Sequence, residues 1–219
     1  MIVAPRISLV VADDHPLLLE GIVRVLSAER DLDVRARCYT GTEALHAIRQ
    51  HQPAVAILDV ALPDMTGLQV MRELRAEDSA TRVVFLTANA TDANIFSMVE
   101  GGAFGLLLKD THIDGLVRCI RQVVSGRRSF PPETITAALE REIGRRERLD
   151  YFVQMLSARE YEILLLAAKG LENKAVAHQL RLSEGTVRLH MHHIYQKTGI
   201  GSRAALVAMA LAYSEIVNQ

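Results

Sequence analysis

Five short apolar runs, each followed by an amphipathic stretch of helical length, divide the first 126 residues of this 219-residue chain. Parallel strands need a crossover, usually a helix, before the next strand can begin, so this alternation is typical of a parallel sheet. The near-continuous apolar character of the runs indicates strands buried on both faces. We therefore predict an α/β, doubly wound, five-stranded parallel sheet, with strands near 7–12, 33–38, 54–58, 82–86 and 104–108.

Polar side chains follow four of these predicted strands, at the point where each strand ends. They are Asp13 and Asp14, Asp59, Thr87 and Lys109. Taken singly, an aspartate after a strand is most simply a helix N-cap, the threonine ordinary strand-end polarity and the lysine a surface charge. Together they lie at the edge where open α/β sheets bind their ligands. Three acids, a hydroxyl and an ammonium at one edge predict a site for a metal ion and a transferable phosphoryl group.

The chemistry of this set assigns a role to each residue type. Three carboxylates at short range cannot all stay ionised without a compensating cation, and oxygen ligands of this kind suit Mg²⁺. One carboxylate has to keep an oxygen free to attack a phosphoryl donor, and Asp59, alone at the end of the central strand, is the best candidate. Lys109 can pair with phosphoryl oxygens, and Thr87 can donate a hydrogen bond to them.

Residues 6–126 resemble the receiver domain of two-component response regulators, which has a flavodoxin-like fold, and we place this domain at residues 1–126. The matching segments are VADDHP at 11–16, LDVALPDMTG at 58–67, LTA at 86–88 and LLKD at 107–110. The resemblance implies that Asp59 accepts phosphate from a sensor histidine kinase. It further implies that Asp14 and Asp59 hold Mg²⁺, that Asp13 acts through water, and that Ala61 offers its main-chain carbonyl. Thr87 would be the switch hydroxyl and Lys109 the phosphate-sensing cation.

One position departs from the receiver pattern. Such receivers usually carry an aromatic ring three residues before the lysine, and this chain has Leu106 there. Phe104 has the same strand parity and is the one nearby ring that could replace it. We therefore predict that phosphorylation takes place but shifts the conformation weakly.

Residues 127–155 form a predicted linker. Gly126 to Pro132 is a loop-like stretch, and 133–148 are read as a charged, solvent-facing helix. Its arginines could contact nucleic acid, but a solvated linker face is favoured. Charge divides at the same place, with 12 basic against 16 acidic residues in 1–126 and 13 against 10 in 127–219. A mildly basic C-terminal part weakly favours an anionic partner there.

Residues 156–219 contain no strand-like run and are predicted to form an all-α domain of four short helices, at 157–169, 173–181, 184–197 and 202–216. The second and third, joined by a tight turn, make a helix-turn-helix, whose second helix enters the major groove. On its outward face, Arg188, Leu189 and His192 are candidate base contacts, although plain surface is an equal reading of His192. Lys174, Thr186 and Lys197 are candidate phosphate contacts.

His190 is read as a packing histidine. Because no cysteine lies near the histidines of this segment, no metal site is expected there.

This region resembles the LuxR-type DNA-binding domain. The matching segments are LSARE at 156–160, GLENK at 170–174, SEGTVRLH at 183–190, IYQK at 194–197 and SRAAL at 202–206. The resemblance implies a last helix that dimerises on DNA through an apolar stripe. Its members would be Leu206, Met209, Ala210 and Tyr213, some of which also serve packing within the domain.

Together the halves resemble response regulators of the NarL/FixJ type. The resemblance implies a cytoplasmic, phosphorylation-driven transcription factor that binds double-stranded DNA and is a homodimer when active. Two alternatives are less favoured. An aspartyl-phosphate hydrolase would want a second acid two residues after Asp59, where this chain has Ala61. A constitutive DNA-binding regulator with a degenerate receiver is less favoured because Asp14, Asp59, Thr87 and Lys109 are all present, but Leu106 keeps this alternative open.

The bulk composition fits this expectation. No apolar run approaches the roughly 18 residues that a membrane helix needs, and the N-terminus lacks the pattern of a signal peptide. We therefore expect no membrane contact. The resemblance to response regulators implies no enzymatic turnover of small substrates. The two cysteines, Cys38 and Cys119, lie in core-like segments and are expected to be reduced, buried thiols.

Overall fold

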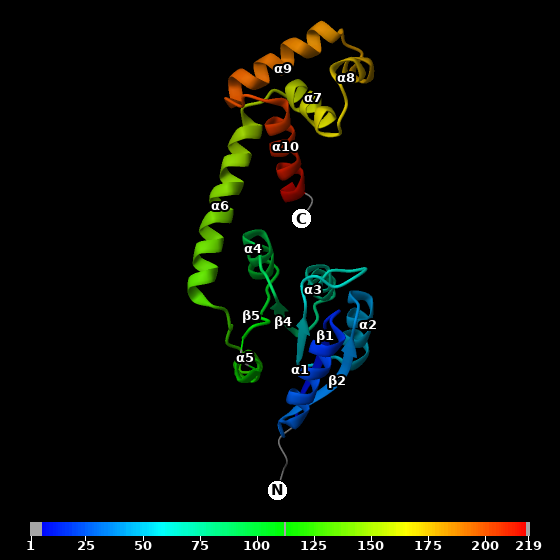
Figure 1. The fold of residues 1–219 in the computed structure, drawn as a ribbon, viewed down its shortest axis with the longest axis vertical. Coiled ribbons are helices and arrows are strands. Elements are labelled where there is room, and N and C mark those ends of the chain that lie inside the picture. The colour runs from blue at the N-terminus through cyan, green and yellow to red at the C-terminus, as the bar shows by residue number, and fades with distance from the viewer. Residues whose placement is uncertain (1–5, 112, 218–219) are drawn as a thin grey trace. The chain divides into compact units, whose positions relative to one another are not determined.

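The computed structural model describes residues 6–111 and 113–217, and the chain divides into two compact units between residues 140 and 141 (Figure 1). The N-terminal unit is built on five parallel strands in the order β2-β1-β3-β4-β5. This order confirms the predicted doubly wound sheet. The strands are β1 Ile7–Ala12, β2 Leu32–Cys38, β3 Val55–Leu58, β4 Arg82–Thr87 and β5 Gly105–Leu108.

Helices cover both faces of this sheet, as the continuous apolar strands predict. One core cluster lies between the sheet and the helices α1 (Pro16–Ala28) and α5 (Ile113–Val124). The other lies under α2 (Gly41–His51), α3 (Gly67–Ala76) and α4 (Asp92–Glu100). Cys38 and Cys119 are free and buried, as predicted. Residues on both clusters fix the strand register, so the carboxyl ends of the strands are held in place.

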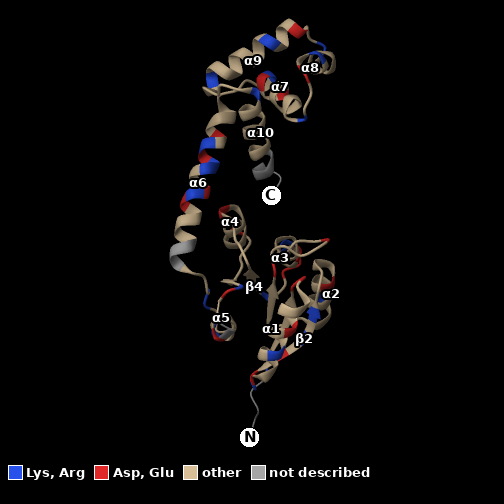
Figure 2. Cartoon of the chain, viewed as in Figure 1, with Lys and Arg blue, Asp and Glu red and all other residues tan. Residues whose placement is uncertain are grey.

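The connector helix α6 runs from Pro132 to Gln154, six residues further than expected. The prediction that it is solvent-facing is wrong for one side of it, because Ala138, Glu142, Leu149 and Phe152 are buried. Their spacing of three, four and seven residues puts them on one helical stripe, which the dense charges on the other side obscured. Figure 2 shows basic and acidic residues interspersed along α6, which suits a solvated outer face rather than a block of positive charge.

The C-terminal unit consists of the end of α6 and four helices whose predicted positions are confirmed within two residues. They are α7 Ala158–Ala168, α8 Asn173–Leu180, α9 Glu184–Thr198 and α10 Arg203–Val217. Ser157 and Ser183 cap α7 and α9 by accepting hydrogen bonds from main-chain amides three residues ahead. The core of the unit holds Val187, Met191 and Ile194, the inner stripe expected for the helix-turn-helix.

Candidate phosphoryl-acceptor site and DNA-binding helix

The polar residues predicted at the strand ends do meet at one edge of the sheet. Main-chain hydrogen bonds extend the parallel ladder past the strands, from Asp59 N to Ala12 O at 2.9 Å and from Lys109 N to Thr87 O at 2.9 Å. Asp13 N likewise donates to the carbonyl of Cys38 at 3.1 Å. The ladder therefore fixes the backbone of each functional residue.

Lys109 joins two of the acids. Its Nζ lies 2.5 Å from Asp59 Oδ2 and 2.7 Å from Asp13 Oδ2. All three side chains are well buried, with exposed fractions of 11% for Lys109, 5% for Asp59 and 2% for Asp13. Burial by itself would lower the pKa of Lys109, but its hydrogen bonds to the two carboxylates outweigh that effect and raise the pKa. The ammonium is therefore firmly charged and sits beside the expected nucleophile.

Asp13, Asp14, His15 and Asp59 offer ligand atoms that all lie within 4.8 Å of one another. The donor set is three carboxylates and one imidazole, which fits a hard divalent cation held mainly by oxygen. The participation of His15 was not predicted. Its Nδ1 lies 2.7 Å from Asp14 Oδ1 and 3.1 Å from Asp13 Oδ1, and its position directly after the two acids was the available signal. Ala61 donates its amide to Asp59 Oδ1 at 3.4 Å, while the role of its carbonyl stays a prediction.

Thr87 is buried at the end of β4, and its Oγ1 donates a hydrogen bond to the carbonyl of Asn89 at 2.9 Å. To bond a phosphoryl group on Asp59, the hydroxyl would have to leave this partner. The role of Thr87 as a switch hydroxyl stays a prediction.

The structure corrects the expectation for Phe104. Leu106 is fully buried in the cluster under α2, α3 and α4, whereas Phe104 packs with the cluster on the opposite face of the sheet. β5 begins at Gly105, so Phe104 lies outside the strand and the alternation of strand side chains does not determine which face it packs on. The guanidinium of Arg82 lies 5.5 Å from the centre of the Phe104 ring. Phe104 therefore cannot supply the ring that Leu106 lacks.

The loop between β3 and α3 contains two residues whose roles the sequence left unassigned. Asp64 has a left-handed backbone (φ 65°), and its Oδ1 accepts hydrogen bonds from the amides of Gly41 at 3.0 Å and Thr42 at 3.4 Å. Hydrogen bonds, led by those from Thr42, lower the pKa of Asp64. A Cβ at Gly67 would come 2.2 Å from the carbonyl oxygen of Asp59, so glycine is required there. Both residues hold the loop that leads away from Asp59.

Replacing Leu106 with tyrosine tests the switch. We expect Leu106→Tyr to raise phosphorylation-dependent dimerisation above that of the parent, at a stability cost of about 1–3 kcal/mol for overpacking a filled core. Sedimentation of both proteins, with and without an acyl-phosphate donor, measures the response. Leu107→Tyr, on the same strand but facing the other cluster, is the matched control. An equal response of the Leu106→Tyr variant and the parent would contradict the prediction.

In the C-terminal unit, the turn between α8 and α9 has the geometry of a helix-turn-helix. Arg181 ends α8 with a left-handed backbone (φ 53°), and Leu182 N donates to the carbonyl of Ala177 at 2.9 Å. Ser183 then caps α9. Two helices joined this tightly present the first turns of α9 to solvent, as a recognition helix requires.

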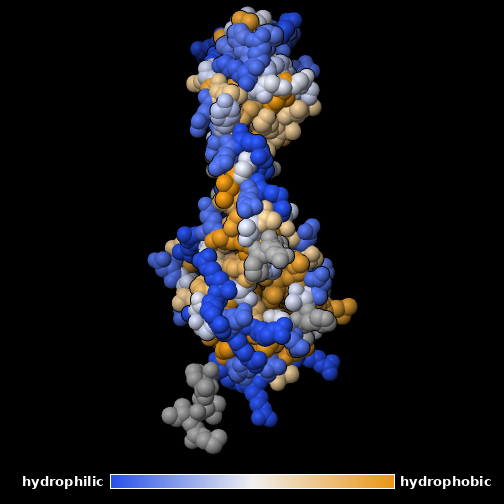
Figure 3. All heavy atoms as spheres, turned by 90° about the vertical axis from the view of Figure 1, so that its left-hand side faces the viewer, coloured by the Kyte–Doolittle hydropathy of each residue, from blue (hydrophilic) through white to orange (hydrophobic). Residues whose placement is uncertain are grey.

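The candidate base contacts lie on the outer side of α9. Arg188 and Leu189 have exposed fractions of 68% and 54%, and His192 is also exposed. The guanidinium of Arg188 lies 3.1 Å from Glu184 Oε1, one turn earlier. Figure 3 shows a largely hydrophilic surface at the upper end of the C-terminal unit, where α9 lies in Figure 1. This surface suits contact with a polar partner.

The candidate phosphate contacts differ in their exposure and in whether they already have a side-chain partner. Lys174 is exposed in the first turn of α8, and the Oγ1 of Thr186 lies 2.7 Å from the Oγ of Ser183. Lys197 has a structural partner that the sequence did not reveal, because its Nζ lies 2.6 Å from Oε2 of the buried Glu160. Their contact with phosphates stays a prediction.

The ion pair of Glu160 predicts a pH dependence of stability. Burial opposes ionisation of Glu160, but hydrogen bonds from Lys197 and Ser157 prevail and lower its pKa to about 2. A carboxyl group whose pKa is depressed by folding stabilises the protein above its unfolded pKa, so this stabilisation is lost as pH falls from about 4.5 towards 2. We expect the free energy of unfolding of the parent to decrease by up to about 3 kcal/mol over this pH range. In Glu160→Gln this contribution to the decrease should be absent. Urea unfolding of both proteins between these pH values measures the difference, and parallel pH profiles would contradict it.

Comparison with known proteins agrees with this geometry. Residues 9–121 match the family model described as the response regulator receiver domain, and residues 154–210 match that of the bacterial regulatory proteins of the luxR family. The chain is a DNA-binding response regulator. It is 36% identical, over 94% of both chains, to the probable transcriptional regulatory protein NarL of Mycobacterium tuberculosis. It is 29% identical to the nitrate/nitrite response regulator protein NarL of Escherichia coli, over 90% of this chain and 91% of the relative.

Solved structures of response regulators resemble it too. The response regulator ChrA of a heme-sensing two-component system matches with a TM-score of 0.55 and 32% identity, over 94% of this chain and 97% of that one. An RcsB–DNA complex matches with a TM-score of 0.59 at 23% identity, over 95% and 98%, which supports the fold. Response regulators of this family are transcription regulators that take their signals from histidine kinases and bind DNA, and receiver domains in general bind Mg²⁺ where they are phosphorylated.

Among the helices that the structure describes, none is both long enough and apolar enough to cross a bilayer. The cytoplasmic location inferred from the sequence stays a prediction.

Proposed function

We propose that this response regulator accepts a phosphoryl group on Asp59 from a sensor histidine kinase. The observation that carries the proposal is the buried contact of Lys109 Nζ with Asp59 at 2.5 Å and Asp13 at 2.7 Å. A carboxylate oxygen of Asp59 attacks phosphorus, the O–P bond forms as the P–N bond of the phosphohistidine breaks, and the imidazole takes up a proton. After transfer, the ammonium of Lys109 can pair with the phosphoryl oxygens in place of the Asp59 carboxylate.

Asp13, Asp14 and Asp59, with the main-chain carbonyl of Ala61, are the residues that would hold Mg²⁺. Bound there, the ion would neutralise charge on the transferring phosphoryl oxygens. The cluster of acid oxygens within 4.8 Å, with Asp14 about one-third exposed and open to solvent, supports this assignment.

We further propose that phosphorylation favours a dimer that binds double-stranded DNA through α9. Formation of an aspartyl phosphate draws the Thr87 hydroxyl from Asn89 towards the new oxygens and biases a pre-existing equilibrium. In the dimer, Arg188, Leu189 and His192 meet base edges, while Lys174, Thr186 and Lys197 contact phosphates. The exposure of Arg188 and Leu189 on the first turns of α9 supports this arrangement.

The test is operator selection from random DNA with and without an acyl-phosphate donor, followed by affinity measurement at fixed salt. We expect the phosphorylated protein to bind the selected operator more tightly, by a factor that depends on protein concentration because dimers bind. An operator affinity unchanged by phosphorylation would contradict the proposal and favour a constitutive DNA-binding regulator.

A further inference from the structure

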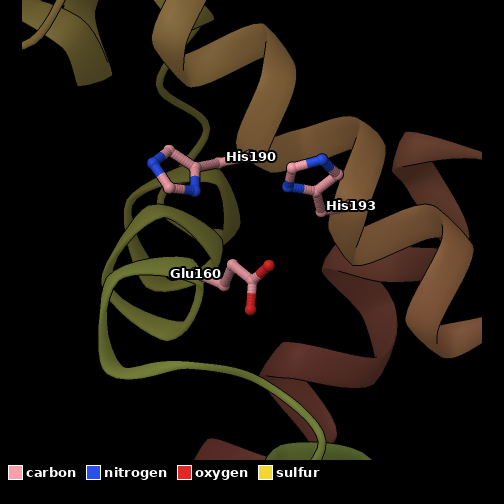
Figure 4. Close-up of side chains that lie close together, drawn as sticks. All are labelled: Glu160, His190 and His193. Atoms are coloured by element: carbon pink, nitrogen blue, oxygen red, sulfur yellow. The ribbon is translucent and has the colours of Figure 1, made fainter.

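Three potential metal ligands face one another between α7 and α9. Glu160, His190 and His193 each offer a ligand atom, and these atoms all lie within 4.8 Å of one another. Figure 4 shows one nitrogen of each imidazole and the carboxylate turned towards the space between the three side chains. The absence of a nearby cysteine argued against a metal site in this segment. A carboxylate from another helix offers a third ligand atom instead.

Helix geometry preorganises the two histidines. They are three residues apart on α9, so both rings leave the same side of the helix. Both are half-buried, and neither has a hydrogen bond or ion pair with any residue in the described part of the chain. Arg188 and Leu189 on the same helix are more exposed than these two histidines.

Glu160 is fixed by contacts that leave one of its oxygens available. Its Oε2 accepts hydrogen bonds from the main-chain amide and the hydroxyl of Ser157, each at 2.8 Å, and from Lys197 Nζ at 2.6 Å. Within residues 6–111 and 113–217, no hydrogen bond reaches Oε1. The side chain is 4% exposed and ionised, so Oε1 is a charged, positioned oxygen that could accept a metal ion.

We propose that Glu160, His190 and His193 form a binding site for a divalent transition metal ion of the Zn²⁺ class, with water completing the coordination. Two imidazoles and one carboxylate are a common Zn²⁺ ligand set, whereas Mg²⁺ and Ca²⁺ prefer oxygen ligands throughout. Zn²⁺ bonds of about 2.0–2.1 Å place tetrahedral ligand atoms roughly 3.3 Å apart. The present separations are no more than 4.8 Å, so the ligand atoms would have to approach one another when the ion binds. The bound ion would link the first turn of α7 to the middle of the recognition helix and stabilise the C-terminal unit.

The charge of Lys197 should weaken Zn²⁺ binding at this site. Its ammonium holds Glu160 through Oε2 and repels a cation at Oε1. We therefore expect Lys197→Met to bind Zn²⁺ more tightly than the parent, whereas loss of either histidine abolishes binding. A carboxylate with a purely structural role would not give these opposite directions.

The test uses the full chain in excess Mg²⁺, which competes for the oxygen-rich cluster at Asp59 but not for imidazole nitrogen. Zn²⁺ is titrated by calorimetry and thermal unfolding, and Co²⁺ is added as a probe because its visible absorption is strong in tetrahedral sites with nitrogen ligands. We expect one ion per chain, a rise in the unfolding temperature with Zn²⁺, and loss of both effects in His190→Asn and His193→Asn. His192→Asn, which removes an exposed histidine on the same helix, is the matched control. We expect this variant to keep both the Zn²⁺ binding and the rise in unfolding temperature.

Absence of Zn²⁺ binding by the parent would overturn the proposal. Equal binding by the parent and the two histidine variants would overturn it as well, because the ion would then occupy another place. If the histidine variants fail to fold, Lys197→Met decides, since unchanged or weaker Zn²⁺ affinity in that variant contradicts a site at Oε1.

Discussion

Asp59→Asn abolishes phosphorylation of this response regulator, because the amide that replaces the carboxylate has no nucleophilic oxygen of comparable strength. The substitution keeps the shape of the side chain, so the fold and the contact of Lys109 with Asp13 remain. Incubation with a labelled acyl-phosphate donor and Mg²⁺ measures the incorporated phosphoryl group. We expect it to fall from close to one group per chain to background.

Asp110→Asn is the control for this result. Asp110 is exposed and directly follows Lys109, so its removal changes the charge near the site without touching the buried carboxylates. We expect this variant to be labelled as the parent is. Labelling that persists in Asp59→Asn would show that another residue is the acceptor. Labelling that disappears equally in Asp110→Asn would show that the loss is not specific to Asp59.

The acid cluster could be predicted from the sequence because the carboxyl ends of parallel strands lie at the same edge of the sheet. Once Asp13, Asp59, Thr87 and Lys109 were each placed after a strand, the topology brought them together without any knowledge of side-chain contacts. The helices of both units were found for a similar reason, since each carries a stripe of apolar residues with helical period.

The remaining features depend on packing that has no local signal. The start of β5 and the contact with Arg82 on the neighbouring strand determine on which face of the sheet Phe104 packs. Strand parity alone therefore gave the wrong answer. The buried stripe of α6 was obscured by charged residues that lie between its members. The partnership of Glu160 with Lys197 spans 37 residues and needs two helices to pack against each other.

Arg188→Ala relaxes the sequence specificity of DNA binding, whereas Lys174→Ala weakens binding to every sequence alike. The Arg188 side chain is 68% exposed and can place two N–H donors on the O6 and N7 of guanine, so its loss should cost about 1–3 kcal/mol on the selected operator. On a scrambled duplex the cost should be small. Lys174 meets a phosphate in our proposal, so its loss should lower both affinities and reduce the salt slope by about 1.

Fluorescence anisotropy with both duplexes over a series of salt concentrations separates these effects, because phosphate contacts release counterions and base contacts do not. The comparison should be made with phosphorylated protein, so that a change in dimerisation does not imitate a change in contact. An equal loss on operator and scrambled duplex in Arg188→Ala would assign that side chain to the phosphates. Base readout would then have to rest on Leu189 and His192, which offer a methyl contact and a weaker hydrogen bond, and the operator would be expected to be rich in A·T pairs.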